Sequence, residues 1–448
     1  MPVGCKSGRL LWLLWLLLPA TALAEGEVWT HAKAWQVVLA RHPALRGAQA
    51  EVDAARARVD QAETPLLPTT TLDASHAQMT ANFTPRPGAV PASFKATAGH
   101  WSAEPFPYWL AQVNTRWNFT DFGRTRRNLD AAYLQVEAER SEVGALRRQL
   151  WLQLTQTYLQ VLAAEASFDA ARQQRDQAAQ RRDLAKKKVE ASLRPPLDLL
   201  RADSDLAAAE VGVFKADDLV RAMRLALGTA MGTGGLVQGP LAPLLPRETD
   251  LTPDRLAGAP PMDQWVDQAM AVRDDFKAID QRMAALRAAH DALQKAALPS
   301  LFVAGQLGAG GIEVSNLVVN GSVTAGLSVP LSGAWLQHGY VGEMQAQLRS
   351  LAAARDVATL ALKAELSQAL TALQQARNRR PAAQTYRQFA EKAHEHALAR
   401  YTAGTATLLE VVDAETAITL ARLQGIQVEF DEALAVARWQ AAMGRTQP

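Results

Sequence analysis

The hydrophobic and polar residues of the chain follow two different periods in different segments. From position 319 to position 331, apolar residues occupy most odd positions, and most of the residues between them are polar or glycine. Residues 110–119 alternate in the same way. A period of two predicts β-strands with one apolar and one polar face. A soluble β-sandwich would show the same alternation, so this pattern alone leaves open whether the apolar face meets protein or lipid.

Much longer segments follow a helical period. No proline occurs between positions 121 and 192, where apolar residues recur at steps of three and four. About 70 helical residues extend roughly 105 Å at about 1.5 Å per residue, so we expect this helix to pack against others in water, as in a coiled coil. A second long helix is predicted for about 337–403, where Pro381 should kink it or locally break its hydrogen bonding. Shorter helices are predicted at about 28–63, interrupted near Pro43, and at 263–297.

Two short segments of the chain match each other. KVEASLRPPLDLLRAD (188–203) and RYTAGTATLLEVVDAE (400–415) share the order Leu, acid, two aliphatic residues, a variable position, Ala, acid, at an offset of 413 − 201 = 212. Ala-Met-Gly recurs at the same offset, at 230–232 and 442–444, and each glycine is suited to a helix C-cap. Leu-Pro recurs at 67–68 and 298–299, an offset of 231. The chain therefore reads as a tandem duplication.

The repeat defines the expected domain organisation. Residues 1–24 are a predicted signal peptide, 25–232 the first repeat, 233–261 a Gly/Pro-rich linker and 262–448 the second repeat. Each repeat has the order helix, two strands, long helix, turn, helix. The change of offset, 231 − 212 = 19, places extra residues in a proline-rich loop between PRPGAVP (85–91) and WSAEPFPYW (101–109).

The first residues carry the features of secretion. Lys6 and Arg9 precede an apolar run, and Ala22-Leu23-Ala24 forms a small-x-small cleavage site. Cleavage would remove Cys5, the only cysteine, and leave a formal charge of 47 − 2 − 45 = 0. An uncleaved anchor is the alternative, but its apolar run is short for a bilayer span.

Four strands without a helical anchor raise a problem of closure. An open sheet edge in lipid leaves backbone groups without hydrogen bonds. Each predicted strand has the length of a tilted span of an outer membrane. We therefore expect several chains to pool their strands into one barrel that stands on a helical stalk.

Other kinds of chemistry find little support in the sequence. The formal net charge is +2 and no basic stripe stands out, which disfavours nucleic-acid binding. His394 and His396 are two positions apart on a helix, so they point to different sides and do not predict a metal site. No nucleophile–base pairing predicts catalysis. Lys186, Lys187 and Lys188 are interpreted as a solvated helix face, with a partner contact as the alternative.

The order of elements resembles that of the TolC family of outer-membrane efflux proteins. The strongest likeness is RYTAGTATLLEVVDAE at the second helix turn; WNFTDFGR (117–124) and Leu298-Pro299 also fit. The resemblance covers essentially the whole mature chain. It implies a mainly α fold with a small β part, in which three chains form one barrel of strands above a periplasmic tube of long helices.

The resemblance also implies a function, partners and a location. The protein would be a passive exit duct of a tripartite efflux or type I secretion system, in the outer membrane of a Gram-negative bacterium. A periplasmic adaptor would dock to it and an inner-membrane transporter would energise it, with no enzymatic activity and no cofactor. The alternative is a periplasmic adaptor without a pore. The two predicted strand pairs disfavour this alternative. The cargo, whether drug, metal or protein, is not determined by the sequence.

Site residues follow from the resemblance at the second turn. Tyr401 and Gly404 would lie at the periplasmic tip, and Glu410 and Asp413 would line the pore entrance. Asp198, in the first-repeat turn, would be the partner of Tyr401. Glu410 and Asp413 are three residues apart and share one helix face, so three chains would form an acidic ring that attracts cations and raises some carboxyl pKa values. A plain solvated helix face is the alternative.

Two departures from the family pattern affect this site. Ala406 stands where some members carry a basic residue that helps to latch the tip. Pro195-Pro196 should make the first turn stiffer than usual.

Overall fold

The computed structural model describes residues 28–80, 105–244, 261–330 and 333–445. The predicted signal peptide, and most of the predicted loop insertion, lie outside these ranges. Elements of the first half are α1 (His31–Arg41), α2 (Pro43–Glu63), the 3₁₀ turn η1 (Thr64–Leu66), β1 (Thr69–Thr80), β2 (Pro105–Thr120), α3 (Arg124–Glu190) and α4 (Pro196–Ala230). Elements of the second half are α6 (Met262–Val272), α7 (Asp274–Lys295), β3 (Ser300–Gly311), β4 (Val318–Ser328), α8 (Gly333–Thr402) and α9 (Leu408–Ala442).

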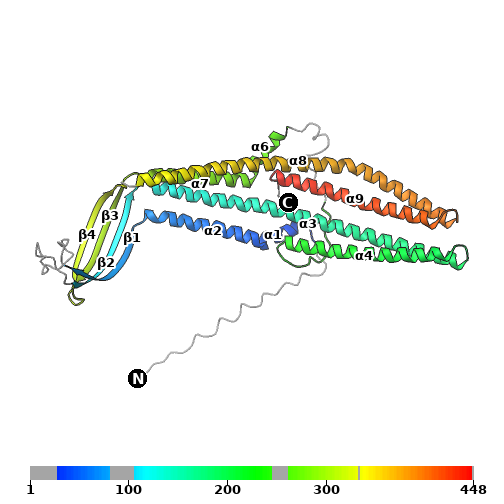
Figure 1. The fold of residues 1–448 in the computed structure, drawn as a ribbon, viewed down its shortest axis with the longest axis horizontal. Helices are drawn as coiled ribbons and strands as arrows, with labels where there is room; N and C mark the ends of the chain where they lie inside the picture. The colour runs from blue at the N-terminus through cyan, green and yellow to red at the C-terminus, as the bar shows by residue number, and fades with distance from the viewer. Residues whose placement is uncertain (1–27, 81–104, 245–260, 331–332, 446–448) are drawn as a thin grey trace, which may run out of the picture.

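The molecule is elongated, with the four strands at one end and the turns of two helical hairpins at the other (Figure 1). The predicted mainly α fold with a small β part is confirmed. Helices α3 and α8 are 67 and 70 residues long. At about 1.5 Å per residue each extends roughly 100 Å, so neither is able to bury its apolar side chains without neighbours along its length.

The helices lie side by side in one layer. Near the sheet, α3 packs between α2 and α7, and α7 packs against α8; towards the far end, α3 packs between α4 and α9, and α9 packs against α8. One side of the layer is therefore α8, and the other is α2 followed by α4. Helix α8 continues through Pro381, so the proline does not interrupt it, and Figure 1 shows the helix bending in its C-terminal part.

The breaks between the short helices were only half predicted. The interruption at Pro43 is present, but residues 263–297 were expected to be one helix and instead break at Arg273, whose backbone is extended (φ −67°, ψ 130°). The Arg273 side chain at this break is buried, and its guanidinium pairs with Asp275 at 2.6 Å and with Glu365 of α8 at 2.8 Å.

The last helix of each half ends on a glycine that packs against one of these breaks. Gly232 and Gly444 both have φ +74°, which agrees with their prediction as C-caps. Gly232 lies against His42 and Gly444 against Arg273, so closely that a Cβ atom on Gly232 would come within 2.9 Å of the His42 Cα. The same contact between a C-terminal glycine and a helix break thus occurs in both halves.

The four strands form one antiparallel sheet in the order β1-β2-β3-β4. Its register places apolar side chains on one face: Leu72, Val113, Trp117, Val303, Leu307, Val319, Val323 and Leu327. The other face carries Thr71, Asp73, Gln112, Asn114, Arg116, Gln306, Ser322 and Thr324. The apolar face is bare in the single chain, where Val323 is 83% exposed and Leu72 is 76% exposed. Strands β1 and β4 have open edges.

Strand β2 begins earlier than the sequence indicated. Residues 101–109 were predicted to be a loop because of their prolines, but Pro105 to Trp109 belong to the strand. Pairing of β2 with β3 begins at Trp109, so beside Pro105 and Pro107 the strand is paired with β1 alone. A proline is tolerated there because one strand edge needs no N–H donor.

An aromatic cluster near the middle of the molecule holds the segment around Trp29 in place. The buried hydroxyl of Tyr158 lies 2.8 Å from the carbonyl oxygen of Trp29 and 2.7 Å from that of Ala242. His31 packs edge-on against the rings of Trp151 and Tyr158. The Thr155 hydroxyl donates to the Trp151 carbonyl, so the His31 Nε2, 2.9 Å away, donates to Thr155. Burial lowers the pKa of His31 to about 4.

This histidine predicts a loss of stability in acid. The pKa of His31 in the folded protein is about 4, below the ordinary value of 6.5, so its contribution is complete above pH 6.5 and is lost as the pH falls towards 4. At pH 4.5 the loss should be about 2–3 kcal/mol relative to pH 7. His31→Gln keeps a donor for Thr155 but does not titrate, so its thermal unfolding temperature should fall less than that of the wild type between these pH values. If the unfolding temperatures of the two proteins fell by the same amount between pH 7 and pH 4.5, this role of His31 would be contradicted.

Candidate pore entrance at the helix turns

The turns of the two hairpins lie beside each other at the end of the molecule opposite the sheet (Figure 1). The first joins α3 to α4 through residues 191–195, and the second joins α8 to α9 through residues 403–407. Gly404 has φ +82°, a conformation that glycine adopts without strain and that lets the chain reverse after α8. Pro196 opens α4 at its first position, where a missing N–H is harmless.

Tyr401 connects the two turns. Its side chain is fully buried, with the Lys188 Nζ 4.2 Å and the Arg194 guanidinium carbon 5.6 Å from its ring centroid. Lys188 also donates to the carbonyl of Tyr401, and Arg194 donates to that of Ala406 at 2.7 Å. Two cations of the first hairpin therefore hold the second, with cation–π attraction added to hydrogen bonds.

Asp198, the predicted partner of Tyr401, is near it without a hydrogen bond among the described residues. The Tyr401 hydroxyl is buried and has no hydrogen-bond partner in that part of the chain. Burial raises the pKa of Tyr401, and the charge of Asp198 raises it further. Lys188 was interpreted as part of a solvated face, and Arg194 was not singled out. Only their contact with a residue more than two hundred positions away makes them part of the site.

Glu410 is exposed, and its carboxylate caps the N-terminus of α9. It accepts hydrogen bonds from the Thr407 backbone N–H at 3.0 Å and the Thr407 hydroxyl at 3.2 Å, and it pairs with Arg400 at 3.2 Å. Thr407 accepts from the Glu410 N–H in return, which completes a capping box. These hydrogen bonds, aided by Arg400, lower the pKa of Glu410 in the single chain. The spacing Thr-x-x-Glu was the sequence signal for this cap.

Asp413 lies one turn further along α9. It is exposed, and no hydrogen bond or ion pair involves it within the described ranges. It is the carboxylate of this pair that remains available to solvent. Arg201, its counterpart in the first repeat, is exposed on α4.

A buried ionic cluster lies between the two hairpins. Arg181 of α3, only 5% exposed, pairs with the buried Glu415 of α9 and, at 3.2 Å, with Asp205 of α4. His394 of α8 completes the cluster, its Nε2 3.7 Å from a Glu415 oxygen. Burial, followed by the charges of Arg422 and Arg181, lowers the pKa of His394 and favours its neutral form. One arginine thus joins both hairpins, and no local pattern indicated it.

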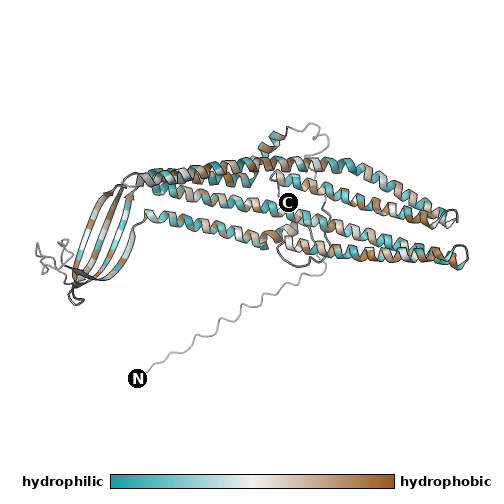
Figure 2. Ribbon diagram, in the orientation of Figure 1, coloured by the Kyte–Doolittle hydropathy of each residue, from teal (hydrophilic) through white to brown (hydrophobic). Residues whose placement is uncertain are grey.

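Within the described residues, no group of three or more His, Cys, Asp or Glu side chains is arranged to hold a metal ion. No helix in the described ranges is both long and apolar enough to cross a membrane. Figure 2 shows hydrophilic and hydrophobic residues interleaved along the long helices.

Comparisons with known proteins reach the same architecture. The family described as "Outer membrane efflux protein" matches residues 34–233 and 265–445. Among solved structures, the outer-membrane channel OprN is 21% identical, with a TM-score of 0.76 over 93% of this chain and 91% of that chain. The outer membrane protein VceC from Vibrio cholerae is 17% identical, with a TM-score of 0.74 over 92% and 96% of the two chains. The MtrE outer membrane channel from Neisseria gonorrhoeae is 18% identical, with a TM-score of 0.71 over 93% and 91%. No curated protein sequence matches significantly.

Proposed function

The chain belongs to the outer membrane efflux protein family, also called the TolC family, and on that premise we propose that three copies form one exit duct served by a periplasmic adaptor and an inner-membrane transporter. The protein is an outer-membrane efflux channel of a Gram-negative bacterium, and its family is one of transport proteins, not of enzymes. The finer statements, on the trimer, the partners and the entrance, are our proposal.

The two-faced sheet is the observation that carries the proposal. One face is apolar and exposed, and the other is polar, as expected for a wall between lipid and water. Strands β1 and β4 have open edges, which lipid leaves without hydrogen-bond partners. Pairing β4 of each copy with β1 of the next removes every edge, and three copies contribute 3 × 4 strands.

The helices support lateral association of the same copies. On α4, at one side of the layer, Phe214 is 70% exposed; on α8, at the other side, Phe389 is 66% exposed and Leu360 is 69% exposed. These apolar side chains lose contact with water if α8 of one copy packs against α4 of the next. The ring of helices then encloses a tube continuous with the barrel.

The alternative function, a periplasmic adaptor without a pore, loses its support. It rested on the long helical hairpins alone, and the family match covers both halves of the chain, strands included. The adaptor enters instead as a partner, for which the adjacent hairpin turns are the exposed end of the tube. The chemical nature of the cargo is not part of the proposal.

Membrane fractionation combined with conductance tests the proposed function. We expect the protein in the outer-membrane fraction, extracted in mild detergent as a heat-resistant oligomer that conducts ions in a planar bilayer. A water-soluble monomer in the periplasmic fraction would contradict the proposal.

The acidic residues at the entrance give a second prediction. Glu410→Gln with Asp413→Asn removes both charges, and glutamine retains an oxygen that accepts the capping hydrogen bonds of Thr407. The cation-to-anion permeability ratio of the channel should fall about two-fold or more, because charged rings at a constriction set ion preference. Asp218→Asn on α4 removes one exposed charge away from the turns and should leave the ratio unchanged. Equal ratios for wild type and double variant would remove the acidic entrance from the account.

A further inference from the structure

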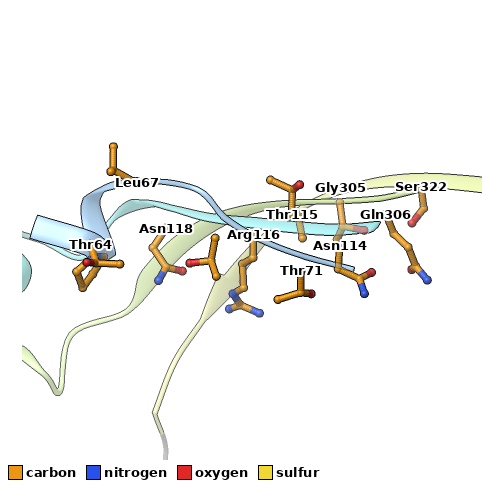
Figure 3. A pocket seen from close by; sticks show the side chains of 14 residues that line it. Thr64, Leu67, Thr71, Asn114, Thr115, Arg116, Asn118, Gly305, Gln306 and Ser322 are labelled. Atoms are coloured by element: carbon orange, nitrogen blue, oxygen red, sulfur yellow. The ribbon is translucent and has the colours of Figure 1, made fainter. Parts of the chain in front are cut away.

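The polar face of the sheet is hollowed where the strands meet the helices. The cavity has a volume of about 580 Å³, within the range of small-molecule sites. Figure 3 shows Asn114, Arg116 and Asn118 of β2 pointing to the same side, with Thr71 of β1 beside them. The cavity is lined by Thr64, Pro65, Leu67, Thr69, Thr71, Asn114, Thr115, Arg116, Asn118, Ala304, Gly305, Gln306, Ser322 and Thr324.

Arg116 is the only charged residue among those that line the cavity. No carboxylate pairs with it within the described part of the chain. The nearest acid of β1 on the same face is Asp73, four residues from the Arg116 partner Thr69, or roughly 13 Å along the strand. Asp73 is engaged elsewhere, since Asn114 donates to it at 2.5 Å and Thr71 at 3.2 Å. The cavity therefore carries an uncompensated positive charge.

The guanidinium has a support that holds it in place. Its central carbon lies 4.0 Å from the centroid of the Phe302 ring on β3. That ring is seated over Gly326 of β4, where a Cβ atom would come within 2.6 Å of the ring. An arginine stacked by one face on a ring keeps its N–H edge free for a planar anion. The row Arg116, Phe302, Gly326 across three strands is thus a built feature of the polar face.

We propose that this cavity binds small organic anions, namely carboxylates, through a two-point contact of the carboxylate with the Arg116 guanidinium. The amide and hydroxyl groups of Asn114, Asn118 and Thr324 supply further hydrogen bonds to the anion or to its bound water. The inference rests on the proposed function, because only in a closed barrel does the polar face line the lumen. Three copies then present three equivalent sites at the junction of strands and helices.

Weak binding suits such a position. The site is open to water. An anion that binds there replaces part of its hydration shell by contacts with the arginine, so the net gain in free energy is small. A conduit requires binding favourable enough to collect a solute and weak enough to release it. We therefore expect dissociation constants in the millimolar range.

Two measurements with 2-naphthoate as the probe test the site. In saturation-transfer NMR on the detergent-extracted protein, 2-naphthoate should bind the wild type, and Arg116→Gln should weaken binding at least five-fold. Phe302→Leu retains the charge but removes the ring under it, and should also weaken binding. In a planar bilayer, 2-naphthoate should reduce the conductance of the wild type and not of Arg116→Gln.

Glu313→Gln is the control, since it changes the charge of an exposed residue of the same sheet's β3–β4 connection, outside the cavity lining and without contact to it. Unchanged binding in this variant, with loss in Arg116→Gln, supports a site. Changes of similar size and opposite sign in the two variants would show a general effect of lumen charge and overturn the proposal, as would equal binding to wild type and Arg116→Gln. An extracted protein that binds the probe without conducting ions would contradict the duct and leave the cavity site standing.

Discussion

Arg181→Met should lower the free energy of unfolding by about 3–5 kcal/mol, because it leaves the carboxylate of Glu415 buried without its partner. Arg181 is 5% exposed and Glu415 is 8% exposed, so water is not available to replace the lost ion pair. Asp205 and His394 also lose a neighbour, and with it the link that joins α3 and α4 to α8 and α9. Thermal and urea unfolding of the extracted protein measure the effect.

A double variant separates the ion pair from packing. Arg181→Met with Glu415→Gln removes both charges and should recover more than half of the loss, since uncharged groups are buried at smaller cost. Arg182→Met is the matched control: Arg182 is the next residue of α3, its side chain is 37% exposed and pairs with Asp203 at 2.9 Å, and its removal should cost much less than that of Arg181. Equal losses for Arg181→Met and Arg182→Met would show that the buried cluster does not stabilise the hairpin ends.

Val323→Lys should block assembly in the outer membrane. Val323 lies on the apolar face of β4 and is 83% exposed in the single chain, so the proposed barrel turns it towards lipid. A lysine facing lipid near the middle of the membrane costs about 2–4 kcal/mol per chain, and each oligomer would carry the substitution in every copy. The heat-resistant oligomer in the outer-membrane fraction should fall to a small share of its wild-type amount.

Thr324→Lys is the control for this prediction. Thr324 is the next residue of the same strand and lies on the polar face, so the same substitution should leave the amount of oligomer close to that of the wild type. If both variants assembled equally well, the apolar face would not meet lipid and the assignment of the two faces would be wrong.

Local patterns explain which parts of the fold were predicted. The alternation at 319–331 identified a two-faced strand because side-chain direction in a strand depends only on position along it. The long proline-free segment predicted α3 because a helical period is likewise a local property of the sequence. Helix α8 was predicted as well, and it continues through Pro381. Strand β2 was predicted too short because the tolerance of Pro105 and Pro107 depends on where β3 ends, which is a property of the sheet.

The candidate site shows where sequence patterns stop. The turn residues Tyr401 and Gly404 were found through a likeness of local sequence, and Thr407 and Glu410 carried a cap signal three residues apart. Lys188 and Arg194 reach Tyr401 and Ala406 across more than two hundred positions, and Arg181 reaches Glu415 across a similar distance. Nothing in one sequence pairs a surface-like lysine with a tyrosine so far away. Such contacts appear only when two hairpins are placed side by side.

Electron cryo-microscopy of the detergent-extracted oligomer tests the shared barrel most directly, through the edges of the sheet. The account predicts a three-fold symmetric particle in which β4 of each copy is hydrogen-bonded to β1 of the next, with Val323 outside and Arg116 facing the lumen. A particle whose β1 and β4 edges stay unpaired, or whose apolar faces pack on one another as in a β-sandwich, would contradict it.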